Sequence, residues 1–359
     1  MRIVRYYEHG DPSVLRVEDA PEPQAGPGEI VIRAEAIGVN YADVQKRQGL
    51  PIGGPVTLPA APAGDVAGVV EAIGAGVSNV AVGDRVVAPV RHGAYAEHAT
   101  AYAATAFPIP AAIDAAQATA LPSPGETAYH VLTTVGRLKP GETVLINAAS
   151  GGIGHLLVQL ARAKGAGRII GTVGSPAKLD FIRSVGVDVA ICYGHEDWAD
   201  EVRAATGDKG ADLVLETVGN EVLAHSIQLA ARFGRIVCYG GASGERWPVI
   251  SPWDFIDMKS LHGLQPVRPV PGPARGHRRR AQGALGMCGV RAGQARRVQP
   301  DPAGGSGQGT RADGGPAAHR QGGPDSLTTT GSCPLPCPLL RSFASLIASM
   351  RSAESQDEH

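Results

Sequence analysis

The segment from Thr143 to Gly154 constrains the fold more than any other part of the chain. It reads TVLINAASGGIG, an apolar β-branched run that gives way to a glycine turn. The apolar residues that follow recur at helical spacing: Ile153, Leu156, Leu157, Leu160 and Ala161. Strand, glycine turn and helix in this order predict the dinucleotide-binding βαβ unit of a doubly wound (Rossmann) parallel sheet.

The glycine turn has the spacing A-x-G-x-x-G, with Ala149, Gly151 and Gly154 in the three key places. Gly151 allows the backbone to approach a pyrophosphate, and Gly154 allows the helix to pack close to the strand. The start of the helix supplies unpaired N–H groups and the positive end of its dipole. This turn is therefore predicted to bind the phosphates of a dinucleotide.

The middle region continues as short apolar runs separated by polar stretches of helical length. These runs are residues 168–173, 187–193, 211–218 and 234–241. Strands that are apolar almost throughout are typical of a parallel sheet covered on both faces. Gly219 and Gly240 fall near the ends of the last two runs, where ligands bind in open α/β sheets.

The end of the second strand indicates which nucleotide is bound. In an NAD site an acidic residue about 20 residues beyond the glycines binds the ribose hydroxyls. Here residues 168–173 are followed by GSPAK, which has no carboxylate, whereas Ser175 and Lys178 can bind a phosphate. We interpret this as a preference for NADPH. The alternative is that Lys178 is an ordinary solvated lysine on the following helix.

The first 120 or so residues have a different pattern. Short β-like runs at 29–39, 65–75 and 84–90 are punctuated by Gly, Pro and Asp and show little helical periodicity. This pattern favours a partly open β-barrel that precedes the nucleotide-binding domain.

Several motifs together resemble the medium-chain dehydrogenase/reductase superfamily, in particular its zinc-free quinone oxidoreductase (zeta-crystallin-like) branch. The resemblance covers residues 1 to about 264 and is carried by GVNYADV (38–44), PAGDVAGVVEAIG (62–74), VGDRV (82–86), GAYAEH (93–98), ETAYHVL (126–132), AASGGIG (148–154) and GTVGSPAK (171–178). It implies a GroES-like substrate domain over residues 1–122 and an NADP-binding Rossmann domain over 123–264.

The resemblance also implies roles for individual residues. The substrate side would be lined by Asn40, Asp43 and Arg47, and Thr127 would approach the nicotinamide. For Asn40 and Asp43 the alternative role is structural, as a hydrogen-bonding pair that caps the turn. Quinone reductases of this branch often have tyrosines at the positions of Gln45 and Pro51, so this chain departs from their pattern for stacking a quinone.

The cofactor-binding residues implied by the resemblance form three groups. The pyrophosphate would be bound by Gly151, Gly152 and Ile153. The 2′-phosphate would be bound by Ser175, Lys178 and Tyr193. The nicotinamide would be flanked by Gly219, Tyr239 and Gly240.

Zinc is not expected. Compared with the zinc-dependent relatives, this chain has Asn40 in place of a Cys, Gly64 in place of a His and Ser123 in place of a Cys, and it lacks their cysteine-rich loop. Zn²⁺ needs three or four N, S or carboxylate ligands, and these replacements remove them. All five cysteines lie outside the predicted barrel.

A site without zinc favours acceptors that can delocalise negative charge. Hydride transfer to a simple ketone would leave a poorly stabilised alkoxide. The prediction is therefore NADPH-dependent reduction of a quinone, with an enone, 2-alkenal or enoyl reductase as the alternative. A third possibility is a dinucleotide-binding protein that is inactive because of its altered C-terminus.

Residues 265–359 form a tail rich in Pro, Gly, Arg and Ser, which is predicted to be disordered. Back-translation of residues 301–326, with each codon begun one base later, permits a reading that ends in TGKVVLT, which resembles the closing strand of the family. The hypothesis is one extra base near Gly263 or Leu264. The family's homodimer would be doubtful with such a tail, because the dimer edge lies where the chain departs.

Composition agrees with a cytoplasmic enzyme that acts on small molecules. The chain carries 33 Lys and Arg against 34 Asp and Glu, a net charge of −1, which does not favour nucleic acid as a partner. Its N-terminus lacks the apolar core of a signal peptide, and no segment is long enough to cross a membrane. The few cysteines fit a reducing compartment.

Overall fold

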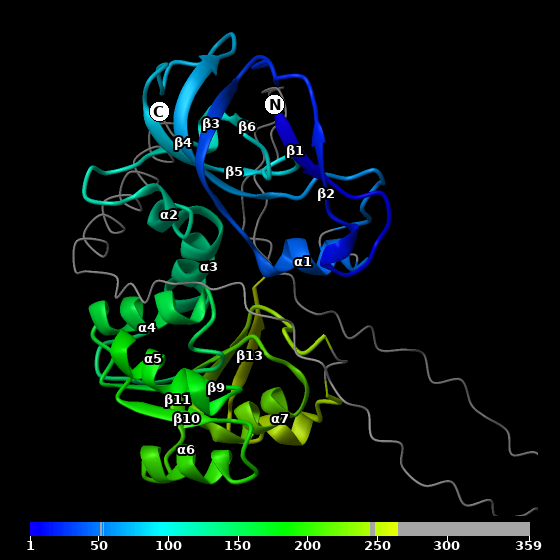
Figure 1. Cartoon of the computed structure of the whole chain (residues 1–359). Coiled ribbons are helices and arrows are strands. Elements are labelled where there is room, and N and C mark those ends of the chain that lie inside the picture. Colours follow the sequence, from blue (N-terminus) through cyan, green and yellow to red (C-terminus); the bar gives the residue numbers. More distant parts are fainter. Residues whose placement is uncertain (51, 53, 245–247, 265–359) are drawn as a thin grey trace, which may run out of the picture. The chain divides into compact units, whose positions relative to one another are not determined.

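The computed structural model describes residues 1–50, 52, 54–244 and 248–264 (Figure 1). The predicted disorder and reading-frame change of residues 265–359 therefore lie outside the described residues. The described N-terminal strands form a two-stranded ribbon and a five-stranded sheet.

The ribbon pairs β1 (Arg2–Arg5) with β2 (Arg16–Asp19) in antiparallel fashion. The five-stranded sheet is also antiparallel and has the order β6-β3-β4-β5-β7. Its strands are β3 (Glu29–Gly38), β4 (Gly64–Ile73), β5 (Arg85–Val90), β6 (His98–Tyr102) and β7 (Phe107–Pro108). Strands β3, β4 and β5 match the three β-like runs of the sequence, whereas β6 and β7 were not predicted. The inner side chains of the sheet, among them Ile30, Ile32, Val66 and Val70, form one buried cluster.

Short helices follow the strands of this sheet. Helix α1 (Tyr41–Arg47) begins directly after β3, and η1 (Pro12–Val14) and η2 (Ala103–Thr105) are single turns. A continuous helical segment then leads to the second sheet through α2 (Ala115–Ala118), η3 (Leu121–Gly125), α3 (Glu126–Tyr129) and η4 (His130–Val135). A capping box fixes the start of α2, since Asp114 accepts from the Gln117 backbone N–H and the Gln117 side chain accepts from the Asp114 backbone N–H.

The second sheet is parallel and has six strands in the order β10-β9-β8-β11-β12-β13. The strands are β8 (Thr143–Ile146), β9 (Arg168–Val173), β10 (Val189–Cys192), β11 (Ala211–Glu216), β12 (Ala230–Cys238) and β13 (Ser260–Gly263). Numbered within this sheet, the order is 3-2-1-4-5-6, that of dinucleotide-binding folds. The strand order reverses between β8 and β11, which places the expected ligand position at the carboxyl ends of these two strands.

Helices cover both faces of the parallel sheet (Figure 1). Helices α4 (Gly154–Ala163) and α5 (Leu179–Val185) pack in one apolar cluster with β8, β9 and β11. Helices α6 (Trp198–Thr206) and α7 (Asn220–Leu229) pack in a second cluster with alternate residues of the same strands. This arrangement confirms the predicted doubly wound sheet. The remaining single turns are η5 (Pro176–Lys178) and η6 (Pro252–Phe255).

The largest difference from the predicted strand boundaries is at the start of β12. Strand β12 begins at Ala230, earlier than the expected Gly234, because Ala230 already pairs with Ala211. The register then shifts at an irregularity that includes Phe233 in a left-handed conformation (φ 64°). Residues 230–235 read AARFGR, in which two arginines and a glycine interrupt the apolar run, so hydrophobicity alone did not identify this first part of the strand.

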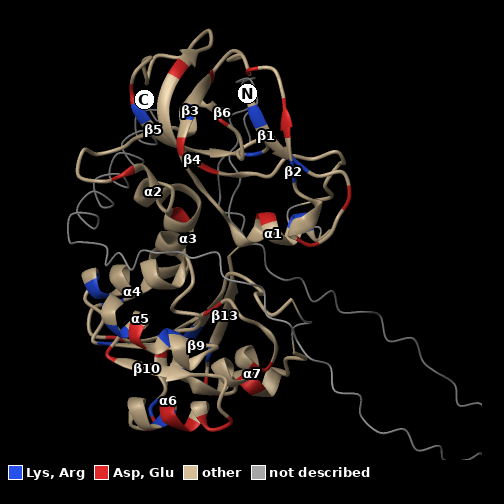
Figure 2. Ribbon diagram, in the orientation of Figure 1, with Lys and Arg blue, Asp and Glu red and all other residues tan. Residues whose placement is uncertain are grey.

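Charges of both signs are mixed over helices α4 to α7 (Figure 2). Asp180 and Arg183 pair on α5, and Asp200 and Arg203 pair on α6. None of the helices in the described part of the chain is long and apolar enough to cross a membrane.

Candidate nucleotide and substrate site

The glycine turn folds between β8 and β9. The Ala149 N–H donates to the carbonyl of Thr172 at 2.8 Å, and the Gly151 N–H donates to the carbonyl of Ala148 at 2.9 Å. Ala148 itself adopts a left-handed conformation with φ 50°. These bonds hold the turn at the carboxyl end of β8, where the sheet order reverses.

Two glycines of the turn have opposite surroundings. A Cβ added to Gly154 would lie 2.2 Å from the carbonyl oxygen of Ala148, so no other residue fits there. A Cβ added to Gly152 would meet nothing within 4 Å. Gly154 thus lets α4 start against the strand, whereas the open side of Gly152 leaves the space that a phosphate needs. The residues present fit a dinucleotide.

The turn leads directly into α4, whose N-cap is Ile153. The first N–H groups of a helix have no partners within the helix and point out of its end. Gly152, Ile153 and Gly154 therefore direct backbone donors away from α4. Pyrophosphate contacts by Gly151, Gly152 and Ile153 stay a prediction.

Ser175, Lys178 and Tyr193 gather at the carboxyl ends of β9 and β10. Ser175 precedes the single turn η5, Lys178 ends it, and the Lys178 N–H donates to the Ser175 carbonyl at 3.1 Å. The Tyr193 ring lies against Gly174, since a Cβ on this glycine would be 3.0 Å from the tyrosine hydroxyl. Burial raises the pKa of Tyr193 above its usual range.

Lys178 is the cation of this group. It is exposed, and it has no ion-pair partner among the residues that the structure describes. An exposed ammonium is suited to a phosphate monoester.

Gly219, Tyr239 and Gly240 follow β11 and β12. Gly219 has φ 88°, a conformation that favours glycine, and a Cβ on Gly240 would lie 2.2 Å from Oγ1 of Thr217, so the Thr217 side chain would have to move. The Tyr239 side chain is buried, which raises its pKa well above the usual value. These three residues surround the turn after β11. Their place beside the nicotinamide stays a prediction.

A buried carboxylate organises this turn. Oε1 of Glu216 accepts from the backbone N–H of Val218 at 2.5 Å and from that of Gly219 at 2.8 Å. Oε2 accepts from Ser226 Oγ at 3.0 Å and from Asn147 Nδ2. Burial raises the pKa of Glu216, although these hydrogen bonds counteract the increase.

Asn147 also connects neighbouring strands, since its Oδ1 accepts from Thr172 Oγ1 at 2.7 Å. Sequence analysis missed both Glu216 and Asn147. The available signal was a polar residue that ends or directly follows an otherwise apolar strand, in ADLVLE and in TVLIN.

On the predicted substrate side, a second buried carboxylate joins three elements. Asp65 on β4 is fully buried; its Oδ2 accepts from Asn40 Nδ2 at 3.0 Å and its Oδ1 accepts from Ser123 Oγ at 2.7 Å. Thr127 lies one helical turn beyond Ser123 and donates from Oγ1 to the Ser123 carbonyl at 2.7 Å. The structure therefore brings Asn40 and Thr127 together through Asp65 and Ser123, which the sequence analysis did not select as site residues.

Asp43 and Arg47 have different surroundings. Oδ1 of Asp43 lies 3.4 Å from Lys46 Nζ. Asp43 and Lys46 line a cavity of about 500 Å³ together with Arg91 and His92. Arg47 is buried and is not among the lining residues. Its carbonyl accepts from the Gly10 N–H, and its Nη1 has no partner in the described part of the chain. A substrate contact by Arg47 stays a prediction.

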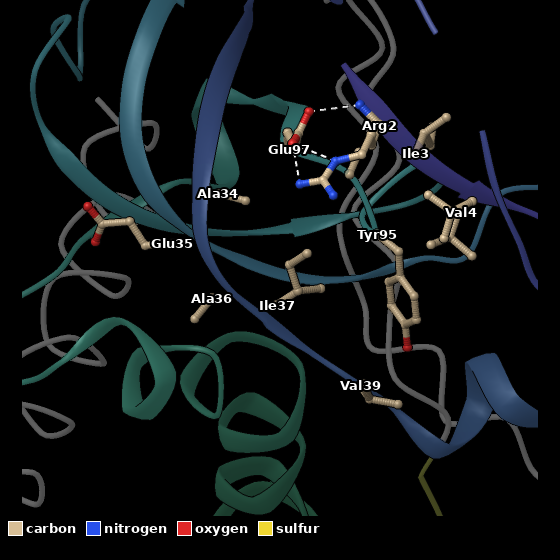
Figure 3. A pocket seen from close by; sticks show the side chains of 12 residues that line it. Arg2, Ile3, Val4, Ala34, Glu35, Ala36, Ile37, Val39, Tyr95 and Glu97 are labelled. Atoms are coloured by element: carbon tan, nitrogen blue, oxygen red, sulfur yellow. Dashed lines mark hydrogen bonds and ion pairs between the residues drawn. The ribbon is translucent and has the colours of Figure 1, made fainter. Parts of the chain in front are cut away.

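A second cavity, of about 480 Å³, lies beside β1 and β3 (Figure 3). Its lining is mainly apolar, with Val4, Ile37 and Tyr95 among it, and Arg2 pairs with Glu97 at its rim. None of the predicted site residues lines it.

Two family models match the chain. The model described as "Alcohol dehydrogenase GroES-like domain" matches residues 26–111, and the one described as "Zinc-binding dehydrogenase" matches residues 152–265. The quinone oxidoreductase of Rattus norvegicus is 34% identical over 244 residues, which cover 67% of this chain and 73% of the relative. The chain belongs to the quinone oxidoreductase branch of the medium-chain dehydrogenase/reductase superfamily.

Two further relatives are a reductase of a named substrate and a structure complexed with NADPH. The 2-haloacrylate reductase of a Burkholderia species is 35% identical over 249 residues, 68% of this chain and 74% of the relative. The structure of Escherichia coli quinone oxidoreductase complexed with NADPH has a TM-score of 0.67 and 32% identity, and it covers 74% of this chain and 81% of that chain. Membership in the branch confirms the predicted GroES-like and Rossmann folds.

Three residues stand where the resemblance places zinc ligands in metal-dependent relatives. Asn40, Gly64 and Ser123 present an amide, no side chain and a hydroxyl. Within the described residues no three His, Cys, Asp or Glu side chains are grouped closely enough to hold a metal. Asp65, linked to Asn40 and Ser123, occupies this place with a hydrogen-bonded polar cluster.

Proposed function

We propose that this chain catalyses the two-electron reduction of a quinone by NADPH without a metal ion. It is an oxidoreductase, and its cofactor is NADPH. The observation that carries the proposal is that Asn40, Gly64 and Ser123 stand where metal-dependent relatives have zinc ligands, and that Asn40 and Ser123 donate hydrogen bonds to Asp65. Small-molecule acceptors are the expected partners.

The chain's own residues would hold the cofactor at the carboxyl edge of the parallel sheet. The α4 start would bind the pyrophosphate, and Ser175, Lys178 and Tyr193 would bind the 2′-phosphate. The turn fixed by Glu216 would carry Gly219 to the nicotinamide. When bound, NADPH supplies the hydride and its two electrons.

The acceptor follows from what this site can stabilise. A ketone would need a Lewis acid or a strong acid for its developing alkoxide. A quinone delocalises the charge over its ring, so that placement of the two reactants provides most of the rate. Asn40 and Asp43 would orient the acceptor, and Thr127 would fix the nicotinamide.

The test combines binding with turnover. Thermal melting of the purified chain with and without NADPH measures binding, and NADPH oxidation with 1,4-benzoquinone measures turnover. Stabilisation together with turnover is expected. Stabilisation without turnover would support the inactive dinucleotide-binding alternative, and the absence of both would contradict the proposal.

Reduction of an activated alkene is the second candidate. It is favoured by the relative named 2-haloacrylate reductase and by Gln45, which stands where quinone reductases often have a tyrosine. Comparison of 1,4-benzoquinone with 2-chloroacrylate, a 2-alkenal and an enoyl thioester separates the two. Turnover confined to the alkenes would replace the quinone assignment. We also propose a cytoplasmic location, on the ground of the few cysteines.

A further inference from the structure

Both carboxylate oxygens of Asp65 are committed to different side chains. Asn40 Nδ2 donates to Oδ2 at 3.0 Å, and Ser123 Oγ is 2.7 Å from Oδ1. Asp65 is fully buried, and the charged group that acts on it among the described residues is Asp43 on α1, which disfavours ionisation. Burial raises the pKa of Asp65 to about 6, so both protonation states occur near neutral pH.

Ser123 connects this buried carboxyl group to the predicted reaction site. Its side chain is half-buried, and it lies one helical turn before Thr127, which is expected beside the nicotinamide. The hydroxyl therefore contacts the fully buried Asp65, while Ser123 itself is only partly buried. A hydroxyl can donate one hydrogen bond while it accepts another, so Ser123 can pass a proton without gaining net charge.

We propose that Ser123 donates the proton that the reduced acceptor takes up and that Asp65 replaces it. The inference rests on the proposed function. Hydride from NADPH reduces the acceptor to an anion and leaves NADP⁺. The Ser123 O–H bond breaks as a new O–H bond forms on the acceptor. At the same time Oδ1 of Asp65 gives its proton to Ser123 Oγ, and Asp65 later regains a proton from water.

The hydrogen bonds determine which state of Asp65 is active. The ionised carboxylate accepts from Ser123, so the serine hydrogen points away from the acceptor. The protonated acid can donate to Ser123 Oγ and free that hydrogen. Because Asn40 donates to Oδ2, the acidic proton belongs on Oδ1, next to Ser123. In this relay Ser123 is the group in contact with the acceptor. Asp65 returns a proton to Ser123, and Asn40 orients Asp65 through its hydrogen bond to Oδ2.

The first test uses the cofactor-free protein. Infrared difference spectra between pH 4 and pH 8 follow the protonated carboxyl band, and Asp65→Asn identifies the Asp65 contribution. Ser123→Ala removes a hydrogen bond to the carboxylate and is expected to move the Asp65 pKa upward. Ser184→Ala, which removes an exposed hydroxyl bonded to the Phe181 carbonyl, is the control. An unchanged Asp65 pKa in Ser123→Ala would overturn the coupling.

The second test uses NADPH and 1,4-benzoquinone. Ser123→Ala is expected to lower kcat by about 10²-fold, the usual size of a general-acid effect, with NADPH affinity unchanged. Ser123→Thr, which keeps a hydroxyl, should restore most of the rate. Wild-type kcat should fall as the pH rises through the Asp65 pKa, and Asp65→Asn should abolish this dependence.

The outcomes separate the two proposals. Wild-type kcat and pH dependence in Ser123→Ala would overturn the relay while leaving the proposed function intact. A wild-type chain that binds NADPH but reduces no acceptor would overturn the proposed function, and the infrared titration would then decide the Asp65 and Ser123 coupling by itself.

Discussion

Asp65 shows how much one buried side chain can change the pH dependence of stability. Its pKa is about 6 in the folded chain against 3.8 for an ordinary aspartate. The folded state therefore binds the proton more tightly, and this contribution to stability is present below about pH 4 and lost as the pH rises through 6. The difference corresponds to about 3 kcal/mol.

Asp65→Asn is expected to remove this pH dependence. Urea unfolding of both proteins from pH 4 to pH 8 measures it: the stability of the wild type relative to the variant should decrease with increasing pH. Two curves that remain parallel over this range would show that Asp65 titrates normally in the folded chain.

Lys178 is a second residue with a measurable consequence. Lys178→Ala should weaken NADPH binding about tenfold, the effect of losing about 1.4 kcal/mol of a charge-assisted phosphate contact, and should leave NADH binding unchanged. Lys209→Ala, which removes an exposed lysine after α6, is the control. Equal losses for NADPH and NADH would argue against the 2′-phosphate role.

At the level of elements, the junction of β8 and α4 offers a matched pair of substitutions. Gly154→Ala places a Cβ 2.2 Å from the Ala148 carbonyl, so α4 must move away from the strand. Gly152→Ala meets nothing within 4 Å and places its methyl group where the pyrophosphate is expected.

Both variants should therefore lose NADPH binding, but for different reasons. Gly154→Ala should also lower Tm by several degrees, whereas Gly152→Ala should keep the wild-type Tm. Calorimetry together with NADPH titration distinguishes them. If Gly152→Ala binds NADPH as tightly as the wild type, the pyrophosphate does not bind beside Gly152.

Strand β9 and the glycine turn could be predicted from the sequence because their signals are local. An apolar run identified β9 at its observed bounds, and the glycine spacing identified the close contact of Gly154. Asp65 and Glu216 could not be predicted in the same way. Each sits in an apolar strand, and its role depends on donors from distant segments, such as Ser123 for Asp65. The roles proposed for Asp43 and Arg47 still rest on family resemblance.

At the scale of the whole molecule, the last described strand, β13, forms one edge of the parallel sheet that the described residues build. Strand β13 pairs with β12, and no other strand of the described residues pairs with it. Apolar side chains just before it are exposed, namely Trp253 at 77%, Ile256 at 67% and Met258 at 54%. The Zinc-binding dehydrogenase model ends its match at residue 265, next to the predicted extra base. An exposed strand edge with apolar neighbours favours aggregation.

Removal of one base near codon 264 should therefore give a protein that is more stable and aggregates less. The expected result is a higher Tm, less aggregation and the homodimer of the family, measured by calorimetry and size-exclusion chromatography beside the chain as written. A fresh read of the gene over codons 255 to 330 checks the hypothesis directly. Third bases that forbid the TGKVVL reading would contradict it.

The short sequence after β9 ties the molecule to the metabolic state of its cell. With the 2′-phosphate contacts proposed for Ser175 and Lys178, the chain would draw its electrons from NADPH in preference to NADH. Flux would then run from NADPH toward the acceptor and would follow the ratio of NADPH to NADP⁺. Growth conditions that deplete NADPH should slow this protein even when its acceptor is abundant.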